Sequence, residues 1–297
     1  MSGANRRDRP GAANIVCDLI GMAGMTQTLS RTASAAAVFC ALAAIPLSAD
    51  ARERRFVFNT ESSVLAPGDA ELEPWTTVRA GREHHYAAFD QRLEFELGLL
   101  PNLQTSLYWN FGAVSQSVLD ETTGRRVRTS SSHFQSLSSE WKYKFSDALA
   151  DPIGFAAYAE GSYGPDEAEL EGKLIFDKQL HNLLLVANLV GEQEWEIADG
   201  ETESEQKLAL TLGAGLFVTP SWVVSLEAIG TTTLVEGGDV ESSVIYAGAS
   251  LAYSSDRYWF AIGAAPQVFA PKSASGDALE LEHGEHVWAR ALLGFRL

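Results

Sequence analysis

Apolar and polar residues alternate along most of this chain, from Glu71 to the final residue. In RLEFELGL (92–99), every second position is apolar, and the positions between carry arginine, glutamate or glycine. The same alternation recurs in LQTSLYWNFGA (103–113), SEWKYKF (139–145) and KLALTLGAGLFV (207–218). A period of two residues is typical of a β-strand whose two faces meet different surroundings. The pattern predicts an all-β protein.

The alternation extends over twelve segments. The predicted strands are 71–81, 86–99, 103–118, 131–146, 152–164, 167–178, 181–197, 205–218, 221–235, 240–254, 257–270 and 284–297. Most contain 11 to 17 residues, whereas a strand of a globular protein usually has about 5–6. A tilted strand needs about 9–11 residues to cross a membrane. The lengths therefore favour strands that span a bilayer.

The predicted connections alternate between short stretches and longer, more polar ones. LPN, KQLHN and TPS are short, whereas LDETTGRRVRTSS, EIADGETESE and PKSASGDALELEHG are long. Bacterial outer-membrane barrels combine short periplasmic turns with longer external loops, and aromatic girdles mark both interfaces. Aromatic residues for an inner girdle stand near the short turns and the C-terminus, at Phe145, Phe176, Trp222, Tyr253, Tyr258 and Phe295.

These features predict a closed antiparallel transmembrane β-barrel of about 12 strands over residues 71–297. An even number of strands leaves both ends of the barrel on the periplasmic side. A secreted β-sandwich is the alternative, because its strands alternate too. It explains neither the loop alternation nor the strand lengths.

The N-terminus carries a targeting signal. From Met25, Arg31 supplies a positive charge, 35–47 is an alanine-rich apolar stretch, and ADA at 49–51 resembles a cleavage site. We expect residues 1–51 to be a signal peptide with an upstream extension, the true start lying near 22–25. Residues 52–70 then form a periplasmic N-terminal segment, which could also enter the barrel as a partial plug. Both cysteines, Cys17 and Cys40, would be removed, which excludes disulfides from the mature chain.

Composition narrows the classes of function. The net charge is −17, which argues against nucleic acid as a partner. Outside the N-terminus no run of about 18 apolar residues occurs, so helical membrane spans are not expected. No motif calls for a cofactor.

Two stretches resemble known outer-membrane proteins. The final strand, HVWARALLGFRL (286–297), is similar to the signal read by the barrel assembly machinery, although Leu297 stands where such signals usually end in Phe or Trp. RLEFELGLLPNLQTSLYWN (92–110) resembles a strand–turn–strand of uncharacterised Gram-negative outer-membrane barrels, similar to putative transporters associated with aromatic (phenol meta-pathway) degradation. The resemblance implies an outer-membrane barrel and supplies no catalytic residues.

If apolar positions face lipid, the alternate positions line the lumen and bring charges there. Because the first and last strands are neighbours in a closed barrel, one charged cluster should share a wall: Glu73, Arg79, Arg92, Glu94, Glu96, Arg290 and Arg296. Such a cluster can act as a selective constriction of a narrow channel. It can also be a salt-bridged filling that closes the lumen. Twelve strands lie between the filled barrels of about 8 strands and the open ones of 16–18, so both hypotheses stand.

Two weaker hypotheses concern metal binding and catalysis. REHH and EHGEH offer His84, His85, His283 and His286 at the external rim, with ligand types that suit zinc or copper. We predict no metal site, because no helical spacing fixes their geometry. His133 lies in the serine-rich stretch TSSSHFQSLSS (129–139), which is the one candidate for a barrel-embedded lipid hydrolase. A polar strand entry explains that stretch as well, and we predict no enzyme.

The sequence therefore predicts a passive channel in the cell outer membrane, exported by the general secretory pathway. The expected solutes are small polar molecules or aromatic acids. The expected partners are outer-membrane lipid, lipopolysaccharide and the barrel assembly machinery. The alternative is a structural or surface barrel that transports nothing.

Overall fold

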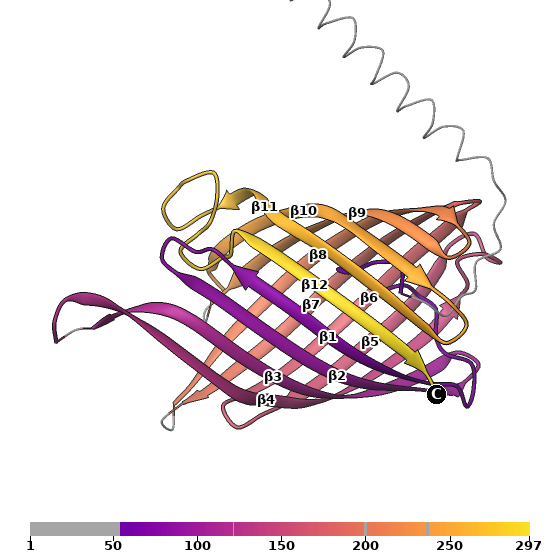
Figure 1. The fold of residues 1–297 in the computed structure, drawn as a ribbon, viewed down its shortest axis with the longest axis horizontal. Coiled ribbons are helices and arrows are strands. Elements are labelled where there is room, and N and C mark those ends of the chain that lie inside the picture. Colours follow the sequence, from indigo (N-terminus) through magenta and orange to yellow (C-terminus); the bar gives the residue numbers. More distant parts are fainter. Residues whose placement is uncertain (1–53, 121, 199–200, 236–237) are drawn as a thin grey trace, which may run out of the picture. The chain divides into compact units, whose positions relative to one another are not determined.

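The computed structural model describes residues 54–120, 122–198, 201–235 and 238–297. All described residues belong to one compact unit. The predicted signal peptide lies outside the described residues. Within them, twelve antiparallel strands form one closed barrel (Figure 1), which confirms the predicted fold class.

The strands follow the predicted segments closely. Their bounds are β1 Ala70–Ala80, β2 Tyr86–Leu100, β3 Leu103–Asp120, β4 Arg125–Ser146, β5 Gly154–Tyr163, β6 Glu167–Leu180, β7 Leu183–Ala198, β8 Glu201–Thr219, β9 Trp222–Leu234, β10 Val240–Ser254, β11 Tyr258–Lys272 and β12 Val287–Arg296. Each strand pairs with the next in sequence, and β12 closes the ring on β1. The closing register runs from Glu71 opposite Arg296 to Ala80 opposite Val287. Both ends of the barrel sequence therefore meet at the rim with the short turns.

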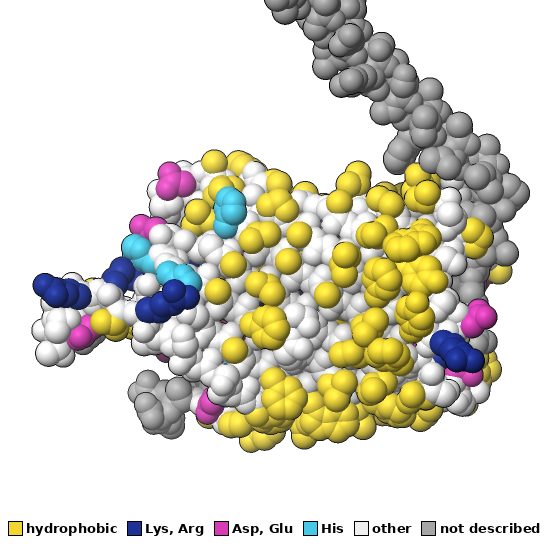
Figure 2. Space-filling model, viewed as in Figure 1, with side chains coloured by type: hydrophobic (Ala, Val, Ile, Leu, Met, Phe, Trp, Pro, Cys, Tyr) yellow, Lys and Arg dark blue, Asp and Glu magenta, His cyan; other side chains and the backbone are white. Residues whose placement is uncertain are grey.

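The outer wall is apolar. Large hydrophobic side chains on alternate positions are exposed there, such as Leu107, Trp109 and Phe111 on β3. The positions between them, such as Tyr108 and Asn110, are buried inside. Figure 2 shows hydrophobic side chains spread over this wall, with charged and histidine side chains gathered towards its ends. Apolar residues outside and polar residues inside are the arrangement of a transmembrane β-barrel.

None of the described residues forms a helix long and apolar enough to cross a membrane.

Aromatic residues gather beside the short turns. Phe155 stacks between Phe145 and Phe176, with ring centroids 4.9 and 5.1 Å away. In a second group, the ring centroids of Trp222 and Tyr253 lie 4.8 Å apart. These contacts join residues from neighbouring strands at one height, as an interfacial girdle requires.

The external connections differ from the prediction. The stretches 119–130 and 198–204 were expected to be mostly loop, but β3 and β4 pair as far as Asp120 opposite Arg125, and β7 and β8 as far as Ala198 opposite Glu201. Polar residues continue these strands because cross-strand hydrogen bonds need no apolar face. The β3–β4 hairpin reaches beyond the other strands (Figure 1).

Gly294 on β12 creates the space for a buried tryptophan at the barrel seam. A Cβ atom at this position would lie 2.2 Å from the indole of Trp259. That indole nitrogen donates a hydrogen bond of 2.8 Å to Glu71. We expect Gly294→Ala to lower barrel stability by about 1–3 kcal/mol, the usual cost of overpacking. The measurement is the temperature at which the folded gel mobility is lost. Gly191→Ala, where the nearest atom is 3.9 Å away, is the control and should melt like the unchanged protein.

Candidate functional site: a charged and occupied lumen

Residues 54–69, called the N-terminal segment below, lie inside the barrel. The segment begins with Arg54 beside β1 and β2, and its next residues cross to β9. It then passes β7 and β6 and returns along β3 to the start of β1. Seven of its sixteen residues are buried, including Phe56 and Val57, and only Pro67 and Gly68 at its end are exposed. The stretch that the sequence offered as a periplasmic segment or partial plug thus occupies the lumen.

The lumen wall supplies hydrogen-bond acceptors for five backbone amides of the segment. Glu227 on β9 accepts hydrogen bonds from the Val57 and Phe58 amides at 2.8 and 2.7 Å. Further along, the Thr60 amide donates to Asn188 at 2.8 Å and the Ser62 amide to Asp177 at 2.7 Å. The Leu65 amide donates to Gln104 at 3.0 Å. A buried backbone without such partners is costly, so these wall residues form a built binding groove for the segment.

Glycines in the wall complete this groove. A Cβ at Gly213 on β8 would lie 2.8 Å from the ring of Phe56, and one at Gly215 would lie 3.1 Å from it. At the other end, Gly68 turns the segment into β1 with φ of +87°, a conformation that favours glycine. The segment is therefore fitted to this wall at both ends.

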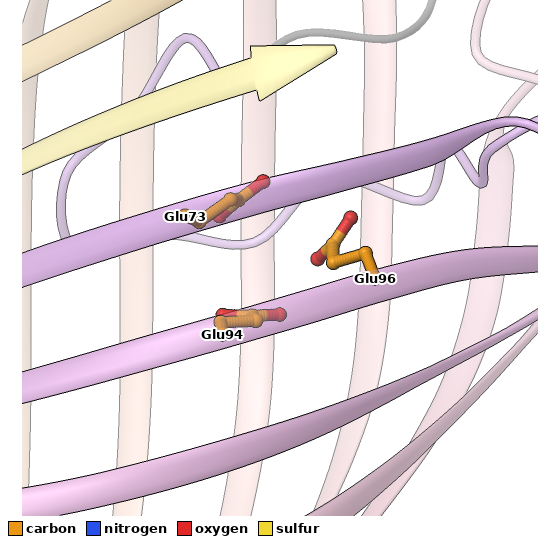
Figure 3. Close-up of side chains that lie close together, drawn as sticks. All are labelled: Glu73, Glu94 and Glu96. Carbon is orange, nitrogen blue, oxygen red and sulfur yellow. The ribbon is translucent and has the colours of Figure 1, made fainter. Parts of the chain in front are cut away.

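Arg54 neutralises part of a buried group of glutamates. Glu73 on β1 and Glu94 and Glu96 on β2 place carboxylate oxygens within 4.8 Å of one another (Figure 3). The Arg54 guanidinium lies 3.2, 3.8 and 3.3 Å from these three carboxylates and 4.4 Å from the centre of the Trp75 ring. Among the described residues this is the one group of three close acidic or imidazole side chains. The segment supplies the cation that these acids need.

Glu61 makes the seating of the segment sensitive to pH. Its side chain is 7 % exposed, and its partner Arg55 lies 3.7 Å away. Burial raises the pKa of the Glu61 carboxyl to about 7. In the unfolded chain the pKa of a glutamate is about 4.3. The seated segment therefore binds a proton more strongly, and its stability is fully present below about pH 4 and falls as pH rises towards 7.

We therefore expect the segment to leave the lumen more often at pH 8 than at pH 5. A single cysteine at Ser62, which is 1 % exposed, would report this, because labelling of a thiol there requires the segment to unseat. Its labelling, corrected for the change in thiolate fraction, should rise with pH between about 5 and 7. In a Glu61→Gln background this rise should disappear. An equal corrected rise in both proteins would show that Glu61 is not the sensor.

A cavity of about 500 Å³ lies above the segment, towards the long-loop rim. Residues 57–60 of the segment line it, together with inward side chains from nearly every strand. One side of the cavity is an arginine wall on β1, β2 and β12. Arg79 pairs with Asp90 at 3.0 Å, and Arg92 lies 3.5 Å from Glu160 and 4.3 Å from the Tyr108 ring centre.

Glutamates form the opposite side, which we call the acidic wall. The strand register places Glu160 opposite Glu171 and Glu171 opposite Glu192, and one level higher Glu169 opposite Glu194. Like charges directly opposite one another destabilise a sheet. Lysines offset part of this cost. Lys207 lies 3.2, 2.7 and 3.0 Å from Glu192, Glu194 and Glu205, and Lys173 lies 2.7 Å from Glu171.

The structure gathers the predicted charged cluster on three neighbouring strands, but at several heights. Glu73, Glu94 and Glu96 surround Arg54 below the cavity. Arg79, Arg92 and Arg290 line the cavity itself. Arg296 lies at the short-turn rim and pairs with Glu71 at 3.4 Å. The cluster is thus three separate groups along one wall.

The histidine candidates lie at the long-loop rim. The two hairpins do meet, because the Glu83 amide donates to Leu281 at 2.6 Å and the His286 amide to Gly81 at 2.6 Å. His84, His85, His283 and His286 are all exposed, and they form no close ligand group among the residues that the structure describes. His133 is exposed on the outer half of β4, opposite Gly112.

Sequence reasoning missed the partners of the N-terminal segment. The alternation puts Glu227 at an inward position of β9, but nothing in the sequence links it to residues 57–59. Asn188 and Gln104 carried no charge to draw attention. One signal was available for Asn188, which is a polar amide within the otherwise apolar stretch LLLVANLV (183–190).

The fold and the lumen define a transmembrane β-barrel whose interior is lined with charges and occupied by its own N-terminal segment. The chain belongs to the family described as "Family of unknown function (DUF6662)", which matches residues 48–296. No match was found among curated proteins.

The fold is similar to that of a solved outer-membrane channel. The COG4313 outer membrane channel from Pseudomonas putida F1 has 12% identity and a TM-score of 0.56, covering 82% of this chain and 100% of that chain. A NanC porin has 10% identity and a TM-score of 0.49, covering 76% and 100%. At 12% identity, the similarity to the COG4313 channel shows the barrel fold alone.

Proposed function

We propose that the chain forms a narrow passive channel in the outer membrane, for small polar or aromatic-acid solutes. The observation that supports this most is the cavity of about 500 Å³. Its lining carries many charged side chains, and its floor is the N-terminal segment, which is not part of the barrel wall. A barrel closed for structural reasons alone has no need of such a cavity. Arg92 with Trp75 and Tyr108 offers a cation and aromatic faces, which suit aromatic acids and fit the resemblance to transporters of aromatic degradation.

Planar bilayer recording of the purified protein tests the channel. We expect small, stepwise currents, because the N-terminal segment narrows the path. The second candidate is a structural or surface barrel with a closed lumen, and the ion pairs around Arg54 favour it. Absence of current at every voltage, from protein with the gel mobility of a folded barrel, would support this second candidate and contradict the channel.

The remaining parts of the proposal concern assembly. We infer that residues 1–51 act as a signal peptide for the general secretory pathway, that β12 is read by the barrel assembly machinery, and that lipid and lipopolysaccharide surround the wall. The seated segment leads to a specific expectation: a chain that retains residues 1–51 should seat Arg54 less completely, because the preceding chain must then leave the lumen. Mass spectrometry of the N-terminus of membrane-extracted protein would test the cleavage.

A further inference from the structure

Arg290 differs from the other arginines of the arginine wall. Its Nε atom donates to Thr77 Oγ1 at 2.9 Å, and Nη1 donates to the Val57 carbonyl at 3.3 Å. Among the described residues, no carboxylate lies within 4.0 Å of its guanidinium. Arg79 and Arg92, by contrast, each have one. A guanidinium has five N–H donors in a fork that fits a carboxylate, so most of the capacity of Arg290 is unused.

The acidic wall has a counterpart to this residue. Glu169 on β6 faces the same cavity, and no lysine or arginine of the described chain lies within 4.0 Å of its carboxylate. Its neighbours Glu171 and Glu192 are paired with Lys173 and Lys207. A carboxylate that lies opposite another carboxylate, with no cation beside it, destabilises the sheet. The ammonium group of a ligand would supply the missing cation.

The two side chains face one another across the lumen. In the strand order of the ring, β12 and β6 are six strands apart out of twelve, and therefore diametrically opposite. Both residues line the cavity of about 500 Å³. This volume lies within the range of about 300–1,000 Å³ that is typical of small-molecule sites.

We propose that this cavity binds small zwitterions, with the carboxylate of the ligand on Arg290 and its ammonium on the acidic wall at Glu169. Amino acids and short peptides have this chemistry. Phe58 and Trp75, whose ring centres lie 5.5 and 5.6 Å from the Arg290 guanidinium, give apolar surface beside the carboxylate end. The inference deepens the proposed function by naming the solute class, and it rests on solutes entering the cavity from the long-loop rim.

Calorimetric titration of the detergent-solubilised full chain tests the site with three probes. Triglycine carries both charges, N-acetyltriglycine only the carboxylate, and triglycinamide only the ammonium. We expect triglycine to bind at least tenfold more tightly than either analogue, because each analogue leaves one wall unpaired. Equal affinity for triglycine and N-acetyltriglycine would reduce the site to a simple anion site and overturn the proposal. So would the absence of binding to folded protein.

Variants assign each end of the ligand. Arg290→Gln should weaken triglycine at least tenfold and leave triglycinamide unchanged, while Glu169→Gln should weaken triglycine and leave N-acetyltriglycine unchanged. Arg126→Gln and Glu203→Gln change exposed residues outside the cavity and are the matched controls. The analogue comparison needs no substitution, so it decides the question even where a variant fails to fold. Binding without bilayer current would contradict the channel and keep the site, whereas current without selective binding would do the reverse.

Discussion

Glu227→Ala is expected to conduct at least twice the mean current of the unchanged protein in planar bilayers. Glu227 accepts three hydrogen bonds from the N-terminal segment, from the Val57 and Phe58 amides and from the Asn59 side chain at 2.9 Å. Hydrogen bonds to a charged group contribute about 1.5–3 kcal/mol each. Since about 1.4 kcal/mol is tenfold in an equilibrium, their loss should strongly populate the unseated state and open the floor of the cavity.

The control for this experiment is another lumen glutamate. Glu192 lines the cavity and pairs with Lys207, and no hydrogen bond or ion pair joins it to the described part of the N-terminal segment. Glu192→Ala should therefore change the selectivity of the current more than its size. Asp177→Ala, which removes the acceptor of the Ser62 amide, should act in the same direction as Glu227→Ala. Labelling of a cysteine at the buried position of Ser62 shows whether the segment has moved. A labelled segment with unchanged current would mean that the segment is not the obstruction.

The sequence predicted the barrel well because a strand with one face in lipid and one in a polar lumen must alternate. RLEFELGLL illustrates this, since Leu93 is exposed on the wall while Glu94 and Glu96 are buried inside. Strand ends were predicted less well where the hairpins leave the membrane. At 125–130 both faces are exposed, so the residues from Arg125 to Ser130 carry no signal of period two.

The interior was predicted only in outline. Inward positions identified Glu73, Glu94 and Glu96 as lumen residues, and ring closure placed Arg290 beside them. Alternation gives the face of a residue but not its partner, because partners across a lumen depend on strand register and height. The contact between Arg54 and these glutamates joins a stretch with no periodicity to strands that follow it. Nothing local in RERRFVFNTESSVL (52–65) shows that its backbone finds acceptors on four different strands.

The two layers of charge in the lumen have different roles. Below, Arg54 and its glutamates fix the N-terminal segment against β1 and β2. Above, Arg290 contacts the carbonyl of Val57 in the same segment while facing the cavity. If the proposed ligand binds Arg290, it lies against the N-terminal segment, which forms the floor of the cavity. Ligand binding and unseating of the segment would then be coupled through Arg290, because a ligand that weakens the contact with Val57 favours the unseated state.

Arg54→Met is expected to release the N-terminal segment and to destabilise the folded protein. The substitution keeps an apolar stem beside Trp75 but removes the cation from three buried carboxylates within 4.8 Å of one another. Removal of one partner from a buried charge pair costs about 3–5 kcal/mol, because the other charges stay uncompensated. Limited trypsin digestion measures the effect, since Arg55 is buried in the seated segment and should be cleaved much faster in the variant. The double variant Arg54→Met/Glu94→Gln lacks one of the carboxylates and should regain most of the protection of Arg55. The control is Arg126→Met, at an exposed position, in which trypsin should cleave after Arg55 as slowly as in the unchanged protein. Equal protection of Arg55 in Arg54→Met and the unchanged protein would mean that the segment is held by its backbone contacts to Glu227, Asn188 and Asp177 alone.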